Sequence, residues 1–345
     1  MNGNNDDQHP EDFFSFSYWL KFNGLYFTEE IDELVDPDHL TEYVEEYSGG
    51  SPVNPDEGYR QTDLSDWLAQ ATELSGSLSN LADDLYTYEY VEEKWPEREV
   101  YNKDAVKETR YGASHKEMNI FWAYDDIMII RAQKTVLNEV KGDLLDGLSD
   151  NLLLDQVNFD FDFLLWLLYQ WRQNNRLRAN LRLHAVSDCK TVGRTNRDRE
   201  VEIGGETDIT RSVPFISAIL EGNKIDEIEG EFIIDGTHIV AKIESEGVIH
   251  VKSSREDMLE LNELKQMGRS VQFLIEMMRL YEEWVKLDPE DRYPPKAFFE
   301  TLLSICDDEG YVAKREPQEL YDDYEAKRAG EVEGPMSNSR LNKFD

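Results

Sequence analysis

Positive charge gathers in one short segment of this chain. Residues 170–199 hold eight Lys or Arg and two acidic residues, a local charge of +6 in a chain whose net charge is -37. The basic residues are Arg172, Arg176, Arg178, Arg182, Lys190, Arg194, Arg197 and Arg199. Guanidinium and ammonium groups bind phosphates and carboxylates through charge-assisted hydrogen bonds. The segment is therefore the first candidate for a binding function.

Three kinds of partner remain open for this segment. Arg172 and Arg176 follow the apolar run FLLWLLYQW, where a helix C-terminus favours cations. Lys190, Arg194, Arg197 and Arg199 lie in or beside a loop with Gly193, a composition typical of a phosphate-contacting tip. The first 100 residues hold 25 acidic and 4 basic residues, so carboxylates of the same chain or of a neighbouring subunit are equally available. The alternatives are internal or subunit pairing, nucleic acid, and another ligand.

The sequence contains no decisive catalytic motif. It lacks the phosphate-binding G-x-x-x-x-G-K-[ST], the dinucleotide-binding G-x-G-x-x-G and the nucleophile elbow G-x-S-x-G. The six histidines show no H-E-x-x-H spacing, and Cys189 and Cys306 stand far apart with no CxxC pair. With 73 acidic residues, neighbouring carboxylates occur by chance. We expect no cofactor, no metal site and no catalytic residue.

A metal-dependent nuclease is the enzymatic alternative, because such enzymes hold a metal with an Asp on one strand and an E-x-K on the next. Asp235 is followed by Val240-Ala241-Lys242, which lacks the Glu that would bind the metal. The suitable E-x-K is Glu139-Val140-Lys141, but it falls in a predicted helix, where Glu139 and Lys141 point to different faces. We rank this function third.

The composition indicates a protein adapted to high salt. Carboxylates outnumber cations 73 to 36, and self-repulsion on this scale destabilises a compact fold unless salt screens it. At 1 M salt the Debye length falls to about 3 Å. No stretch approaches 18 consecutive apolar residues, and residues 1–12 are polar and acidic, unlike a signal peptide. These features predict a halophilic, archaeal-type cytoplasmic protein without a membrane partner.

The elements of the N-terminal half predict an α+β domain over residues 13–160, after a disordered segment 1–12. Alternating aromatic residues from Phe14 to Phe22, then Asn23-Gly24, predict a hairpin that returns through residues 25–27. Helices are expected at 29–35, 38–47 and from about 62 to Leu85, and a polar irregular stretch at 95–117. A second hairpin at 120–130, a helix at 136–148 and a strand at 152–159 complete this domain.

The C-terminal half predicts a second α+β domain over 161–329, with a mobile polar tail at 330–345. A buried helix at 163–171, capped by Asp160 or Asp162, precedes strands at 180–187, 199–204, 225–234, 238–244 and 247–252. Helices are expected at 213–220, 255–287, 296–306 and 317–329. The predicted fold class is α+β, with antiparallel strand meanders packed against long amphipathic helices in two domains.

Part of the chain resembles the recombination-associated RdgC-type family. The resemblance rests on FDFLLWLLYQW at 161–171, SAILEGNK at 217–224, the hairpin and long helix that follow, and MNIFWAYDDIMIIRA before them. It covers residues 118–285, and the chain departs from the family in its first 110 residues and in Asn223 before the lysine. The resemblance implies a closed dimer that binds duplex DNA without sequence preference and without catalysis.

The leading hypothesis is therefore a non-enzymatic, halophilic protein that contacts nucleic acid. The predicted contact residues are Arg176, Arg178, Arg182, Lys190, Arg194, Arg197 and Arg199. The alternative hypothesis is an interaction or assembly protein, self-association included, whose basic segment pairs with an acidic partner surface.

Overall fold

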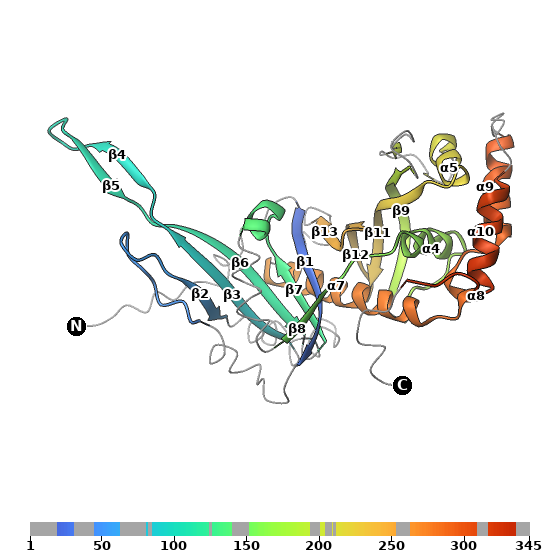
Figure 1. Ribbon diagram of the computed structural model, residues 1–345, viewed down its shortest axis with the longest axis horizontal. Helices are drawn as coiled ribbons and strands as arrows, with labels where there is room; N and C mark the ends of the chain where they lie inside the picture. The colour runs from blue at the N-terminus through green and yellow to red at the C-terminus, as the bar shows by residue number, and fades with distance from the viewer. Residues whose placement is uncertain are drawn as a thin grey trace. The chain divides into compact units, whose positions relative to one another are not determined.

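The computed structural model describes two compact units of the chain (Figure 1). The described residues are 19–30, 45–62, 81, 85–123, 126–139, 152–193, 201–203, 209, 212–252, 263–308 and 317–335. One unit comprises residues 21–156, and the other comprises 1–20 together with 157–345. The boundary predicted from the sequence lies at 160/161. The predicted disordered segment 1–12 and residues 336–345 of the predicted tail lie outside the described residues.

Unit 21–156 contains an antiparallel sheet with the strand order β1-β7-β6-β3-β2. The strands are β1 (Trp19–Glu30), β2 (Glu57–Gln61), β3 (Leu85–Lys94), β6 (Ser114–Ala123) and β7 (Ile127–Arg131), and β8 (Leu152–Gln156) also pairs with β1. The predicted hairpin at 120–130 is confirmed as β6 and β7. Buried aromatic and aliphatic side chains of β3, β6 and β7, among them Trp122 and Ile130, form the core of this unit.

The predicted turn at Asn23-Gly24 is wrong. Both residues lie inside the single strand β1, where the register against β7 shifts between Phe22 and Gly24, a β-bulge. Asn23 donates its side-chain amide to the carbonyl of Ala132, so it serves a buried contact instead of a turn. A Cβ atom at position 24 would lie 2.9 Å from the Cβ atom of Ile130, so glycine is required there for close packing of the strands.

The helix predicted to end at Leu85 is also wrong at that end, because Leu85 begins β3. Residues 63–80 and 82–84 of that prediction lie outside the described residues. The helices predicted at 29–35 and 38–47 do not hold where they are described: residues 29 and 30 belong to β1, and residues 45–47 are not helical. Residues 134–139 form the start of the helix predicted at 136–148, whose remainder lies outside the described part of the chain.

The stretch 95–117, which we predicted to be irregular, contains two complete strands and the start of β6. β4 (Glu97–Tyr101) and β5 (Lys107–Tyr111) pair with each other, and β3 and β6 continue the same hairpin toward the sheet. We call residues 97–111 the β4–β5 ribbon. Figure 1 shows it in teal, extending from the β3–β6 hairpin. Among the described residues, no third strand pairs with it.

The second unit is built on the antiparallel order β10-β9-β11-β12-β13. Its strands are β9 (Leu181–Val192), β10 (Val201–Ile203), β11 (Lys224–Ile234), β12 (Thr237–Glu244) and β13 (Val248–Lys252). Each of these agrees with a predicted strand, although β9 runs five residues past the predicted end at 187. The turns at Asp235-Gly236 and Glu246-Gly247 have glycines at φ 83° and 76°, the left-handed region that favours glycine.

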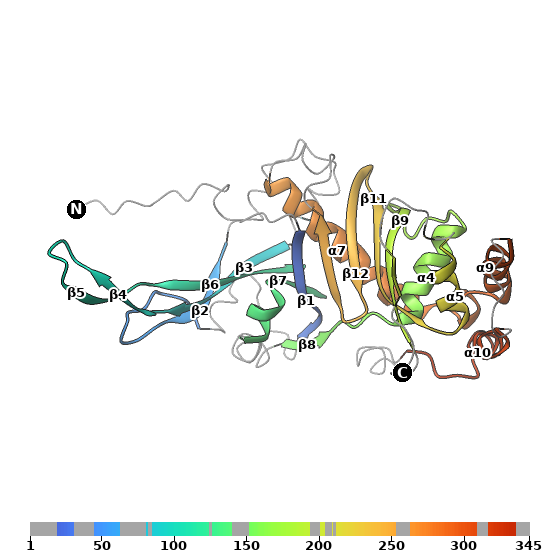
Figure 2. The same cartoon turned by 90° about the horizontal axis from the view of Figure 1, so that it is seen from above.

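In the described part of this unit, six helices accompany the sheet. They are α4 (Phe161–Arg172), α5 (Val213–Leu220), α7 (Glu263–Lys286), α8 (Pro289–Arg292), α9 (Lys296–Asp308) and α10 (Gln318–Arg328). Figures 1 and 2 show α4 and α5 beside β9, with α9 and α10 beyond them. The predicted cap is confirmed, because the Asp160 side chain accepts from the backbone N–H of Asp162. Residues 255–262, predicted to begin the long helix, lie outside the described residues.

An aromatic cluster joins α4 to α7. Phe163 stacks on Trp166 and meets the rings of Tyr281 and Trp284 edge-on, at centroid separations of 5.1 and 5.5 Å. Trp166 is 7% exposed, and its indole N–H donates to the carbonyl of Asp291.

The α+β fold class is confirmed. In the described part of the chain, no helix has the length and apolar character needed to cross a membrane.

We expect Trp166→Ala to lower the free energy of unfolding by about 3–5 kcal/mol, because it empties a packed aromatic site and removes a hydrogen bond. Chemical denaturation followed by circular dichroism measures this change. Leu153→Ala is the matched control, since Leu153 is 45% exposed and its truncation should cost less than about 0.5 kcal/mol. Equal losses in the two variants would contradict the assignment of α4 to the core.

Candidate functional site

The basic segment runs from the end of α4 along β9. Arg176 and Arg178 lie in the turn between these elements, whereas Arg182 and Lys190 lie on β9 itself. Arg194, Arg197 and Arg199 lie outside the described residues. Four of the seven predicted contact residues can therefore be placed.

Arg178 forms two ion pairs with α7 of the same unit. Its Nε atom lies 2.8 Å from a carboxylate oxygen of Glu276, and its Nη1 atom lies 2.8 Å from one of Glu283. The two glutamates are seven residues apart, so they share one face of the helix. The guanidinium fork thus binds one carboxylate with each of two nitrogens, and the Arg178 side chain is only 22% exposed. This cation has its partners within the chain.

The other described cations of the segment do not converge on one place. Arg176 is exposed, and its guanidinium donates to the nearby carbonyl of Ala179 at 3.4 Å. Arg182 donates to the side-chain oxygen of Asn174. Lys190 lies eight residues further along β9, about 26 Å away at strand spacing, with its amine 3.8 Å from a carboxylate oxygen of Asp226. These positions do not form a single phosphate-binding concavity.

The residues considered for a nuclease serve structural contacts instead. Asp235, in the β11–β12 turn, accepts hydrogen bonds from Arg269 and Gln272 of α7. Lys242 pairs with Glu227 across the β11–β12 ladder at 2.7 Å. Glu139 pairs with Lys116. Within the described ranges, no group of three or more His, Cys, Asp or Glu side chains is arranged to hold a metal ion.

Both cysteines are buried thiols, Cys189 in the sheet and Cys306 in α9. Burial raises the pKa of each thiol, and neighbouring carboxylates raise it further. A thiol whose pKa is raised carries little thiolate and is a poor nucleophile at neutral pH. The cysteines are therefore packing residues.

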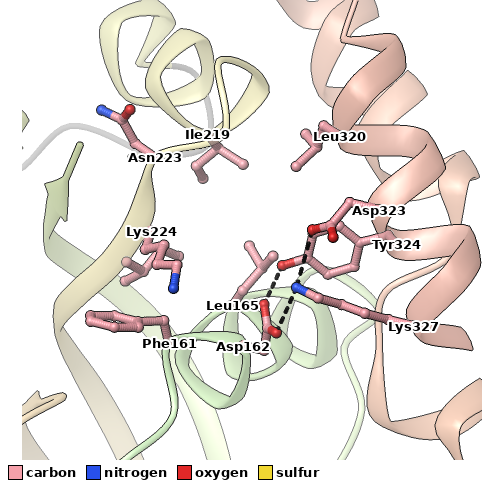
Figure 3. Close-up of a pocket in the computed structure, with 12 residues that line it drawn as sticks. Phe161, Asp162, Leu165, Ile219, Asn223, Lys224, Leu320, Asp323, Tyr324 and Lys327 are labelled. Carbon is pink, nitrogen blue, oxygen red and sulfur yellow. Dashed lines mark hydrogen bonds and ion pairs between the residues drawn. The ribbon is translucent and has the colours of Figure 1, made fainter. Parts of the chain in front are cut away.

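A polar pocket lies between the start of α4 and α10 (Figure 3). Asp162 accepts a hydrogen bond from the Tyr324 hydroxyl and lies 2.9 Å from the Lys327 amine, which also pairs with Asp323 at 3.2 Å. Burial disfavours the charge on Lys327, but Asp162 and Asp323 together outweigh this effect, so the pKa of the amine is raised. Because these charges pair with one another, the cluster attaches α10 to α4.

The β4–β5 ribbon is the most solvent-exposed part of the described structure that has regular strands. Tyr101 is 73% exposed, Tyr111 is 50% exposed, and Val106 in the turn is exposed as well. Residues 97–111 hold four acidic and four basic side chains, so the ribbon is neutral in a chain with a net charge of -37. Exposed aromatic residues and arginines are the side chains enriched in protein interfaces.

Sequence reasoning missed this ribbon, although a signal was present. Val100, Tyr101, Thr109 and Tyr111 are strand-favouring residues, but charged neighbours on both faces remove the apolar alternation. The turn is defined by Asn102, whose side-chain oxygen accepts from the backbone N–H groups of Asp104 and Val106. The sequence feature that could have predicted the ribbon is Asn102, a turn-favouring residue between two strand-favouring runs.

No protein-family model and no curated protein matches this chain. The resemblance to the RdgC-type family stays a prediction.

We expect Arg178→Gln to lower the free energy of unfolding by about 1–3 kcal/mol, because it leaves Glu276 and Glu283 without their cation. Arg176→Gln is the matched control and should change it by less than about 0.5 kcal/mol. Denaturation midpoints measure both changes. If the denaturation midpoint of Arg178→Gln is unaltered and the variant loses duplex DNA binding, Arg178 is a nucleic-acid contact and not a structural ion pair.

Proposed function

We propose that this chain is a non-enzymatic interaction and assembly protein of a salt-rich cytoplasm, and that the β4–β5 ribbon is its contact element. The observation that carries this proposal is the exposure of Tyr101, Val106 and Tyr111 on a ribbon that packs against no further strand among the described residues. An isolated two-stranded ribbon is marginally stable in water. A partner that covers its aromatic side chains would supply the missing stabilisation.

The nucleic-acid hypothesis receives less support from the described residues. Arg178 is paired with two carboxylates of α7, and Arg182 and Lys190 lie far apart along β9. In molar salt the counterion-release contribution to phosphate binding shrinks, so a binding site there would need converging guanidinium groups. Among the described cations, Lys190 lies far from the arginines around the α4–β9 turn, and Arg178 is already paired with two glutamates.

We expect the protein, tagged and isolated from its own cells, to occur in particles heavier than its chain mass of 40.3 kDa. Tyr101→Ala/Tyr111→Ala should shift it toward that mass without changing its melting temperature, because both side chains are exposed. Size-exclusion chromatography with light scattering measures the particle mass. Val53→Ala is the control, since Val53 is 94% exposed but lies outside the ribbon.

Two outcomes would contradict the proposal. One is a wild-type particle that stays at 40.3 kDa in the cell extract at all concentrations. The other is retention of generic duplex DNA by the purified protein at about 0.1–0.3 M salt, with the tyrosine variant binding as well as the wild type.

Salt adaptation gives a separate prediction. We expect the melting temperature to rise as KCl increases from about 0.1 M to about 2 M, because screening relieves repulsion among the 73 carboxylates. Differential scanning calorimetry measures this dependence. A flat or falling melting temperature over that range would remove the argument for a salt-rich compartment.

A further inference from the structure

The outer edge of β5 offers unpaired backbone groups in a defined pattern. The N–H of Asn102 donates to the carbonyl of Val106, and the N–H of Gly112 donates to that of Pro96, so these positions are hydrogen-bonded pairs of the ribbon. Because the pattern alternates along a strand, Glu108 and Arg110 also direct their backbone groups toward β4. Lys107, Thr109 and Tyr111 direct theirs to the open edge.

The side chains of β5 have a charge pattern that is complementary to itself. The strand reads Lys107-Glu108-Thr109-Arg110-Tyr111, so opposite charges lie one residue to either side of Thr109. An antiparallel copy centred on Thr109 would place each Glu108 opposite the partner copy's Arg110. It would also place each Lys107 opposite a tyrosine ring, an arrangement that permits a cation–π contact.

The backbone and the charges select the same register. With Thr109 at the centre, the three outward residues of one strand meet the three outward residues of the other, and each pair exchanges two hydrogen bonds. Glu108 and Arg110 then fall in the non-hydrogen-bonded pairs, whose side chains approach most closely. If the pairing were centred one residue to either side of Thr109, two Arg110 or two Glu108 side chains would lie opposite each other, which is destabilising.

The ribbon by itself leaves an unfavourable charge arrangement. Arg98 lies directly opposite Arg110 on the same face, and Glu108 contacts Arg110 from its own strand at 3.3 Å. A second carboxylate from an adjoining strand would reduce this repulsion. The β4 edge lacks this complementarity, because an antiparallel copy centred on Glu99 would place two glutamates opposite each other. The β5 edge is therefore the one suited to pairing.

We propose that the partner of the ribbon is a second copy of this chain, joined by antiparallel β5–β5 pairing centred on Thr109. This inference rests on the proposed interaction function and specifies its partner. The pairing makes a four-stranded sheet about a two-fold axis, the commonest symmetry of soluble oligomers. The interface is small, so the association is reversible and depends on concentration.

The register is tested by cross-linking in 2 M KCl, roughly the salt in which the acidic fold is screened. Thr109→Cys places two thiols on residues whose Cα atoms are about 5.5 Å apart in the proposed pair, within the range of a disulfide. We expect mild oxidation to give a covalent dimer. Lys103→Cys, in the turn, is the control and should stay monomeric; the natural Cys189 and Cys306 are buried.

Charge exchange tests the complementarity. Glu108→Arg or Arg110→Glu alone should abolish the concentration-dependent dimer, because each opposes like charges across the axis. The double variant Glu108→Arg/Arg110→Glu should restore it. Asp104→Arg and Lys103→Glu make the same changes in net charge within the turn and should have no effect. Sedimentation equilibrium measures the dimer, and circular dichroism checks that each variant is folded.

The outcomes separate this inference from the proposed function. A purified wild type that remains at 40.3 kDa and a Thr109→Cys variant that does not cross-link would overturn self-pairing. If the tyrosine variant still lost its heavier particles in the cell extract, the ribbon would bind another protein and the interaction function would stand. A dimer that survives both single charge variants would also overturn the proposed register.

Discussion

Carboxylate repulsion constrains how this chain places every cation. With 36 Lys and Arg against 73 Asp and Glu, each positive side chain has several possible partners. In the described structure, many cations connect segments that are distant in the sequence. Arg178 joins the start of β9 to α7, Arg60 joins β2 to the buried Glu89 of β3, and Lys327 joins α10 to α4. Removing one such cation leaves carboxylates unpaired and adds to the repulsion.

Two of the described cations of the basic segment, Arg178 and Lys190, follow this constraint. A local excess of positive charge in an acidic chain resembles a binding patch when only the sequence is considered. The described cations instead have neighbours within their own unit: Arg178 meets two glutamates, and Lys190 approaches Asp226. The charged side chains of the β4–β5 ribbon differ from these paired cations, because they point into solvent on both faces of the ribbon. Positive charge placed there does not hold the fold together.

The sequence predicted those elements whose apolar residues follow a clear period. α4 and α7 were predicted from helical spacing, and β11 to β13 from alternation with glycine turns. The prediction failed where tertiary contact decides the structure. Asn23-Gly24 is a common turn pair, but the approach of Ile130 makes it a bulge inside β1. The ribbon has no buried face, so periodicity gave no signal. The partners of Arg178 lie about a hundred residues away, and spacing along the chain cannot identify them.

In the salt-rich compartment that we propose, screening decides which electrostatic contacts can contribute to function. At about 1 M salt, charges separated by more than roughly 3 Å of solvent barely attract one another. A diffuse basic patch therefore loses its long-range pull on phosphate, whereas direct pairs such as Arg178 with Glu276 keep their hydrogen bonds. The same reasoning favours recognition by strand register over recognition by net charge. In a β5–β5 pair the backbone groups fix the alignment, and Glu108 and Arg110 discriminate between registers at contact distance. We propose that an acidic protein in concentrated salt associates specifically through such a short ribbon of zero net charge.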